Sequence, residues 1–214
     1  MIIKIVRTIV LGICVFSFSL SLFAQQLELG TENLQVLQTD GFFFKDHNKN
    51  GALDVYEDWR LTPQVRAEHL VSLMTVAEKA GAMLHGTLPL DQSQNANALN
   101  YDLALAGELI QDRNINHLIT RLSGSPEKIA EQNNHIQTLA ESSRLGIPVT
   151  VSTDPRHHFQ FTEGASVANI GFSQWPETLG FAALRDADLV KQFADIARQE
   201  YRAVGIHMGL SPQA

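Results

Sequence analysis

The twelve residues 46–57 combine the residue types and the spacing of a calcium-binding loop of the EF-hand kind. Calcium takes six to eight oxygen ligands, and such a loop supplies them from positions 1, 3, 5, 7, 9 and 12. Gly51 stands at position 6, where the chain must turn sharply. The sequence predicts a structural cation site, and the alternative is a loop that keeps the turn without the ion. The predicted ligands are Asp46, Asn48, Asn50, the backbone carbonyl of Ala52, Asp54 and Glu57.

A second candidate group begins at Asp154, which ends the strand predicted at 147–154. In parallel α/β proteins, ligands meet the carboxyl ends of the strands. A carboxylate placed there can accept hydrogen bonds from two hydroxyls of a sugar. The structural alternative is that Asp154 pairs with Arg156 or caps a backbone turn. Glu163 and Glu177 are candidate acids or bases by residue type alone.

His157 and His158 follow Asp154 closely, so a metal-dependent hydrolase stays open as an alternative. Adjacent residues on an extended chain point to opposite sides. A third ligand, such as His207, would therefore have to come from another strand. This spacing favours roles in a substrate loop or in packing for the two histidines. The sequence contains no Gly-rich phosphate loop with its lysine.

These groups need a scaffold, and the hydrophobic pattern after residue 103 alternates between helix and strand. It predicts helices at 103–112, from Ser125-Pro126 to Gly146 and around 190–201, and strands at 115–122, 147–154 and 206–210. A βαβαβ order implies parallel strands joined by right-handed crossovers. The residues expected on the buried faces of the later two helices are Ile129, Ile136, Ala140, Val190, Phe193, Ala194, Ala197 and Tyr201.

The segment before this pattern is predicted to be partly irregular. Residues 25–62 are expected to form an extended arm that carries the cation loop, because Gly41 and the aromatic run 42–44 do not favour an entering helix. Residues 86–101 are rich in Asn, Gln and Ser, and this composition is typical of an exposed loop.

Two helices are predicted between these irregular segments. Thr62 followed by Pro63 indicates the start of the first helix. Thr75 and Glu78 have the spacing of a capping box, which indicates the start of the second. The apolar side chains expected on one buried helical face are Leu70, Leu73, Met74, Ala77 and Leu84.

The first 24 residues have the pattern of a secretory signal peptide, with a short positive start, an apolar run at 9–23 and Ala24 at the cleavage position. The run is short for a membrane span, and the alternative is an uncleaved anchor. Cys14, the single cysteine, lies inside this segment, and Ile13 before it does not favour lipidation. The sequence predicts secretion to the periplasm or the extracellular space, with stability that depends on a core rather than on disulfides.

The charge balance is acidic. The chain has 16 basic and 23 acidic residues, a formal net charge of −7, which becomes −9 without Lys4 and Arg7. A negative surface disfavours nucleic acid and anionic membranes as partners. We expect no organic cofactor, no nucleic-acid partner and no membrane contact beyond the signal peptide.

Three segments of the chain carry a resemblance to a known family. They are residues 46–60 leading into 66–83; Gly146-Ile147-Pro148 with Ser152-Thr153-Asp154-Pro155-Arg156-His157-His158; and Phe172 to Gly180 with residues 203–206 and Leu210-Ser211-Pro212. In order and spacing they resemble the N-terminal domain of glycoside hydrolase family 3, the secreted β-glucosidase-like enzymes. The resemblance implies an α/β fold, an incomplete (β/α)8 TIM-like barrel of about three βα units, preceded by the EF-hand-like loop and helices.

The same resemblance implies a division into a signal peptide at 1–24, an arm with the loop at 25–62 and the N-terminal part of the barrel at 63–214. It implies hydrolysis of terminal β-linked sugars with retention, by a nucleophile and an acid/base carboxyl roughly 5–5.5 Å apart. By the family pattern neither carboxyl lies within these 214 residues, so the fragment itself is expected to be inactive.

One sugar-binding residue carries over from the resemblance. Asp154 matches the family's aspartate that holds hydroxyls of the sugar in the first subsite, and Arg156, His157 and His158 are weaker substrate-binding candidates. The expected substrates are oligosaccharides, polysaccharides or aryl β-glycosides. A non-catalytic calcium-binding α/β module is the alternative from a different class of function.

Overall fold

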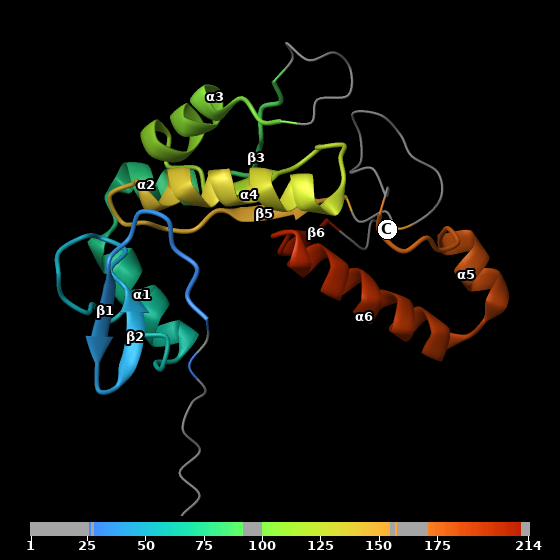
Figure 1. The fold of residues 1–214 in the computed structure, drawn as a ribbon, viewed down its shortest axis with the longest axis horizontal. Coiled ribbons are helices and arrows are strands. Elements are labelled where there is room, and N and C mark those ends of the chain that lie inside the picture. The colour runs from blue at the N-terminus through green and yellow to red at the C-terminus, as the bar shows by residue number, and fades with distance from the viewer. Residues whose placement is uncertain (1–25, 27, 92–99, 155–156, 158–170, 211–214) are drawn as a thin grey trace, which may run out of the picture.

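The computed structural model describes residues 26, 28–91, 100–154, 157 and 171–210, and Figure 1 labels its elements. The strands are β1 (Val36–Thr39), β2 (Phe42–Lys45), β3 (Gly86–Thr87), β4 (His117–Ile119), β5 (Thr150–Thr153) and β6 (Met208–Gly209). The helices are α1 (Pro63–Leu73), α2 (Val76–Ala82), α3 (Leu103–Gly107), the π-helix η2 (Glu108–Asp112), α4 (Pro126–Glu141), α5 (Thr178–Leu184) and α6 (Ala187–Ala203). The predicted signal peptide at 1–24 lies outside the described residues. Among the described residues, no helix has the length and apolar character needed to cross a membrane.

The central sheet has four parallel strands in the order β3-β4-β5-β6. This confirms the predicted α/β fold with parallel strands and helical crossovers. The prediction of an exposed loop from residue 86 is wrong at its start, because residues 86–87 form β3 and Leu88 is buried. A strand of two residues, one of them glycine, has no periodic signal of its own, and only its pairing with β4 defines it.

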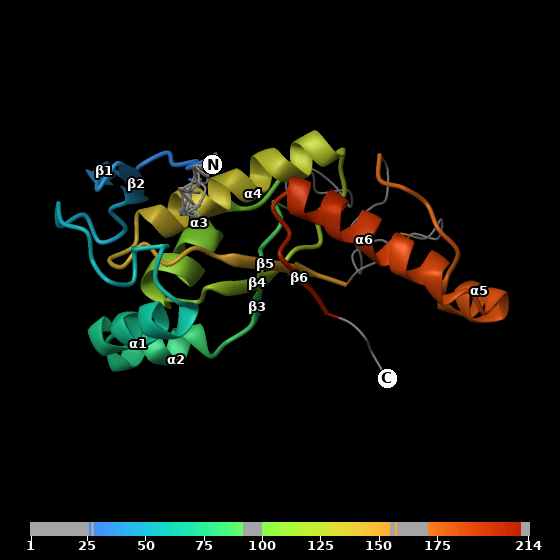
Figure 2. The same ribbon diagram turned by 90° about the horizontal axis from the view of Figure 1, so that it is seen from below.

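The hydrophobic core lies between one face of this sheet and the helices α3, η2 and α4. Figure 2 shows α4 running along one side of the strands. Leu118 on β4 and Val151 on β5 are fully buried there. The prediction for α4 is confirmed, since Ile129, Ile136 and Ala140 are all buried. Burying one aliphatic side chain contributes about 1.5–3 kcal/mol, so this layer is the main source of stability for the sheet.

One buried tyrosine adds polar contacts to the core. The Tyr101 hydroxyl lies 2.9 Å from Asn133 Oδ1 and 2.6 Å from Thr120 Oγ1. Because a carbonyl oxygen only accepts, the tyrosine donates to Asn133 and accepts from Thr120. The Asn133 amide then donates to the Val204 carbonyl at 2.7 Å. The network links β4, α4 and the end of α6, and burial raises the pKa of Tyr101.

Helices α1 and α2 begin at the predicted capping residues. Thr62 accepts a hydrogen bond from the Val65 amide through its side chain, and Thr75 and Glu78 make both bonds of a capping box. These signals involve residues within one helical turn, so the sequence alone is sufficient to predict them.

The predicted apolar face of α1 and α2 is wrong for Leu73, Ala77 and Leu84, which are exposed, while Leu70 and Met74 are partly buried. Helix α1 buries no residue fully. Helix α2 buries Glu78 and Gly81 instead. A Cβ at Gly81 would lie 2.4 Å from the carbonyl oxygen of Asn114. The close backbone contact that only glycine permits therefore decides which side of α2 faces inward.

The arm before the cation loop forms a β-hairpin rather than an extended segment. Asp40 and Gly41 at its turn have φ values of 54° and 81°, as two-residue hairpin turns require. Phe44 is fully buried and stacks on Trp59 at 5.7 Å between ring centroids. The Trp59 indole N–H also donates to the carbonyl of Phe43 at 2.9 Å. The Asp-Gly pair before an aromatic run is the local signal that indicates this hairpin.

Helices α5 and α6 lie at the end of the molecule opposite the β1–β2 hairpin (Figure 1). The predicted buried face of α6 is confirmed for Ala197 and Tyr201, each 9% exposed, and is wrong for Val190, which is 40% exposed, and for the exposed Ala194. Phe193 is partly buried, with its ring 4.8 Å from that of Phe181 on α5. Only the last third of α6 thus contacts the core beside the sheet.

Candidate functional site

Asp154 follows β5 at the carboxyl end of the sheet, as predicted. Ile119 on β4 and Ser152 on β5 are register partners, and their side chains project to the same face. Arg121 and Asp154 continue that face two residues further along each strand. A backbone hydrogen bond of 2.8 Å from Thr120 to Ser152 keeps the two chains paired up to this point. The sheet therefore brings Arg121 and Asp154 together at its carboxyl end.

The side chains of these two residues form an ion pair, with Arg121 Nη1 at 3.4 Å from Asp154 Oδ2. They remain 31% and 21% exposed. A carboxylate beside a guanidinium offers acceptors and donors at one place, which suits a ligand rich in hydroxyl groups. Arg121 escapes sequence-based prediction because it lies inside the run that predicts the strand 115–122. The signal that could have revealed it is a charge at the carboxyl end of a parallel strand.

The same face of the sheet carries a second polar contact nearer its middle. His85, just before β3, has its Nε2 atom 2.7 Å from the hydroxyl of Ser152, which is fully buried. The two faces of the sheet thus differ in chemistry. The helix-covered face carries the aliphatic Leu118 and Val151. The face that leads to Asp154, here called the hydrogen-bonding face, carries Ser152 and Asp154 beside Ile119.

His157 is 3% exposed and packs among aromatic rings, with centroid distances of 4.5 Å to Tyr201 and 5.8 Å to Phe172. Its Nε2 atom lies 2.9 Å from Glu200 Oε2. This environment supports a packing and positioning role rather than direct contact with a ligand. Glu177 is the N-cap residue of α5, without a side-chain capping bond. Three other candidates, Arg156, His158 and Glu163, lie outside the described residues.

The metal-dependent alternative needs Asp154, the two histidines and a third ligand such as His207. His207 precedes β6 and lines a cavity at the amino end of the sheet, whereas Asp154 lies at the carboxyl end. Burial lowers the pKa of His207. Across the part of the chain that the structure describes, no group of three or more His, Cys, Asp and Glu side chains is arranged to hold a metal ion.

The loop 46–57 has the turn of an EF-hand at its start. Asp46 is 1% exposed, and its carboxylate accepts from the amides of Asn50 at 3.1 Å and Gly51 at 2.8 Å. Gly51 has a φ of 77°, which favours glycine. Glu57 at the other end of the loop accepts from the amides of His47 at 2.7 Å and Asp54 at 2.9 Å. Backbone donors thus hold the first and last carboxylates of the loop.

The middle of the loop fits a cation by residue type but not by side-chain orientation. Asn48 and Asn50 both direct their amide nitrogens to Asp54 Oδ2, each at 2.7 Å. Their amide oxygens accept from the backbone amides of Asn50 and Ala52. A bound cation would require oxygens where these nitrogens now point. Burial also raises the pKa of Glu57 above its usual value of 4.5, which a cation would oppose.

The loop is docked on the turn 143–146 that connects α4 to β5. The contacts run from Lys49 Nζ to the Ser143 carbonyl at 2.7 Å, from His47 Nδ1 to the Gly146 carbonyl at 2.9 Å and from the Tyr56 hydroxyl to the Leu145 carbonyl at 3.2 Å. These donors satisfy carbonyls that follow the C-terminus of α4, and the lysine complements the negative end of its dipole. The loop therefore stabilises the turn that leads into β5.

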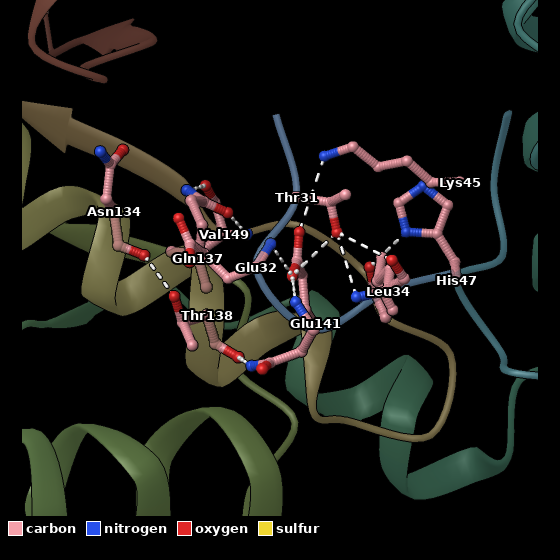
Figure 3. A network of polar contacts seen from close by, with 12 residues as sticks. Thr31, Glu32, Leu34, Lys45, His47, Asn134, Gln137, Thr138, Glu141 and Val149 are labelled. Atoms are coloured by element: carbon pink, nitrogen blue, oxygen red, sulfur yellow. Dashed lines mark hydrogen bonds and ion pairs between the residues drawn. The ribbon is translucent and has the colours of Figure 1, made fainter. Parts of the chain in front are cut away.

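Glu141 at the end of α4 ties the N-terminal arm to the same end of the sheet (Figure 3). One carboxylate oxygen accepts from Thr31 Oγ1 and from the amides of Glu32 and Asn33, at 3.3, 3.0 and 2.9 Å. Lys45 lies 3.7 Å from the other oxygen. Between the arm and α4 is a cavity of about 580 Å³, also lined by His47 and Gln137. Burial lowers the pKa of His47.

The chain belongs to glycosyl hydrolase family 3. Its residues 77–214 match the model of the glycosyl hydrolase family 3 N-terminal domain. This membership agrees with the parallel α/β fold.

Three relatives show the similarity in more detail. A periplasmic beta-glucosidase/beta-xylosidase of Dickeya chrysanthemi is 54% identical over 191 residues, which cover 89% of this chain and 29% of the relative. A probable beta-glucosidase C of Aspergillus oryzae and the beta-glucosidase C of Emericella nidulans are each 41% identical over 77% of this chain and 26% of their own length. The chain thus spans under a third of the length of the curated relatives that it matches.

Proposed function

We propose that this chain is the N-terminal part of a secreted, retaining, exo-acting β-glycosidase that hydrolyses terminal β-linked glucose- or xylose-type sugars. In this proposal the four parallel strands are the first strands of a (β/α)8 barrel, and Asp154 binds hydroxyls of the terminal sugar. The nucleophile and the acid/base carboxyl lie outside these 214 residues. The isolated chain is then inactive and poorly folded, since β3 and β6 are edge strands of an open parallel sheet.

The observation that carries the proposal is the position of Asp154. It follows β5 on the hydrogen-bonding face of the sheet, partly exposed, with Arg121 beside it. Catalytic and binding groups of (β/α)8 enzymes lie at this end of the strands. The names of the relatives, a beta-glucosidase/beta-xylosidase and two beta-glucosidases C, support the substrate class. The signal-like residues 1–24 and the periplasmic relative support export.

Purified full-length protein, meaning this chain with its barrel completed, is expected to cleave aryl β-glucosides or β-xylosides. Residues 25–214 alone are expected to give no cleavage above the buffer rate. Chromogenic aryl glycosides measure both outcomes. Cleavage by residues 25–214 would overturn the assignment of the catalytic carboxyls, and an inactive full-length protein would overturn the proposed reaction.

The turn of the loop 46–57 favours a second, structural function. The buried Asp46 accepts the amides of Asn50 and Gly51, as the first residue of an EF-hand loop does. We infer that Ca²⁺ binds weakly to this loop once the Asn48 and Asn50 amides rotate. The ligands are then Asp46, Asn48, Asn50, the Ala52 carbonyl, Asp54 and Glu57. One loop with three carboxylates suits a structural site in a calcium-rich exterior.

Calorimetric titration with calcium tests this second function independently of activity. The wild type is expected to bind in the range of about 10⁻⁴–10⁻³ M, and Glu57→Ala is expected to lose binding. Asp58→Ala is the matched control, because that carboxylate is next in the chain and pairs with Arg60 instead. Equal affinity of the wild type and Glu57→Ala would refute ligation by Glu57.

A further inference from the structure

Glu200 on α6 contacts both described segments that flank residues 158–170. His157 Nε2 lies 2.9 Å from Glu200 Oε2, a contact that is an ion pair when the imidazole is protonated and that does not have hydrogen-bond geometry. The amide and the hydroxyl of Ser173 donate to the two oxygens of the same carboxylate, each at 2.9 Å. One side chain on α6 therefore fixes the chain shortly after Asp154 and again where it returns to the helical part of the fold.

Main-chain and indole contacts also join the two segments to each other directly. The Trp175 amide donates to the carbonyl of His157 at 2.6 Å, and the Trp175 indole donates to the Ser173 hydroxyl at 2.8 Å. Tyr201 and Phe172 pack around the imidazole. This aromatic cover keeps the His157 imidazole away from water, whereas the Glu200 side chain is 26% exposed. Residues 157 and 173–175 are thus tied by both side chain and backbone.

Asp154 lies three residues before this anchor. Three residues span at most about 11 Å even when the chain is fully extended, so the anchor limits where the chain can run after β5. On the other side of Asp154, the amide of Leu210, just after β6, donates to the carbonyl of Thr153 at 2.9 Å. The backbone at Asp154 is therefore confined between the sheet and α6. Arg121 approaches its carboxylate from β4.

We propose that His157, Ser173 and Glu200 form a positioning clamp that sets the orientation of Asp154 for its sugar hydroxyls. None of the three needs to touch the substrate. The clamp rests on the proposed glycosidase function, because it acts through the substrate-binding role of Asp154. It assigns His157 a role different from the weak substrate-binding role expected from the resemblance.

A double-mutant cycle in the full-length protein tests the clamp. His157→Leu is expected to lower kcat/KM for an aryl β-glycoside about tenfold, because small displacements of a binding group cost one to two orders of magnitude. In an Asp154→Ala background, His157→Leu is expected to lower kcat/KM less than about twofold, since the group that the clamp positions is absent. His157→Gln keeps a polar side chain near Glu200 and is expected to recover most of the rate.

Glu200→Gln and Ser173→Ala repeat the double-mutant cycle without replacing the buried His157 imidazole. The test therefore does not depend on the folding of one variant. Equal losses of kcat/KM in both backgrounds would overturn the clamp, since they would show an effect that does not pass through Asp154. An inactive wild type would instead overturn the proposed function, and the clamp with it. The matched control is Asp195→Ala on the exposed side of α6, where the carboxylate pairs only with Arg198 and Gln199 in the described contacts. This variant is expected to leave kcat/KM unchanged in both backgrounds.

Discussion

The two ends of the parallel sheet are built in different ways. At the amino end, the turn 143–146 is held by the loop 46–57, and Arg144 reaches back to Glu78 on α2. At the carboxyl end, Arg121 and Asp154 form one long ion pair with both side chains partly exposed. The contacts at the amino end stabilise the fold, whereas the carboxyl end leaves polar side chains accessible for a ligand.

This difference follows from the geometry of parallel strands. The turn 143–146 at the amino end has carbonyls that need local donors, and the loop 46–57 supplies them. Two connections at the carboxyl end, 88–102 and 154–177, are longer than those at the amino end, and such connections can vary without loss of the core. The comparison predicts that variants at the amino end change unfolding, while variants at the carboxyl end change turnover.

The largest expected effect on stability is that of Gly146→Val. Gly146 has a φ of 55°, and a Cβ there would lie 2.5 Å from the carbonyl oxygen of His47. Strain and clash together are expected to cost about 3 kcal/mol or more in the free energy of unfolding. Urea unfolding of the full-length protein measures it. Gly30→Val is the control, because nothing lies within 4 Å of its added Cβ. A similar urea midpoint for the two variants would show that Gly146 does not stabilise the amino end of the sheet.

The matching variant at the carboxyl end is Asp154→Ala. Loss of hydrogen bonds to sugar hydroxyls is expected to lower kcat/KM about 10²-fold, or about 2.7 kcal/mol. The free energy of unfolding is expected to change by about 0.5 kcal/mol or less, because the pair with Arg121 is long and partly exposed. Steady-state kinetics and thermal unfolding on one preparation check both values. Unchanged kinetics would contradict the assigned role.

A smaller effect is expected from Glu78→Gln at the amino end. Arg144 lowers the pKa of Glu78 to about 2, so the charged form stabilises the fold above its usual pKa of 4.5 and the contribution is lost as the pH falls toward 2. With Arg144 half exposed, the variant is expected to cost about 1–2 kcal/mol at pH 7 and almost nothing at pH 2. Thermal unfolding across that range measures the difference.

Glu131→Gln is the control for that prediction. Its carboxylate forms an exposed i,i+3 pair with Lys128 on α4, and surface pairs of this kind contribute little. The melting temperature is therefore expected to stay the same at both pH values. If Glu131→Gln lowered the melting temperature as much as Glu78→Gln, the stabilisation would not be specific to the pair of Glu78 with Arg144.

The smallest expected effect is that of Glu57→Gln, and its sign depends on calcium. Burial raises the pKa of Glu57, so the folded protein binds the proton more tightly than the unfolded chain. Stability from this group is present below pH 4.5 and falls as the pH rises through the folded pKa. Without calcium at pH 7, Glu57→Gln is expected to unfold at the same temperature or slightly higher. With millimolar calcium, the wild type is expected to become the more stable of the two.

The sequence was sufficient where the signal is local. The capping residues Thr62 and Thr75 act within one helical turn, and the strand pattern that predicts β5 leads directly to Asp154. It was not sufficient where the partners are distant in the chain. His157 meets Glu200, and Glu141 meets Glu32, across separations that no periodic pattern encodes. The sequence places His157 close to Asp154 but gives no sign of its contact with Glu200, so it predicts a ligand-binding role for the histidine.

The contacts of Glu141 also have a consequence for the order in which the protein folds. Thr31 and Asn33 bind a carboxylate that lies 110 and 108 residues further along the chain. During synthesis the arm therefore emerges long before the helix end that holds it, and it must wait until α4 and the following turn are complete. The arm docks late and closes a long chain segment. In an exported protein, it docks only after the residues near 146 have also been translocated.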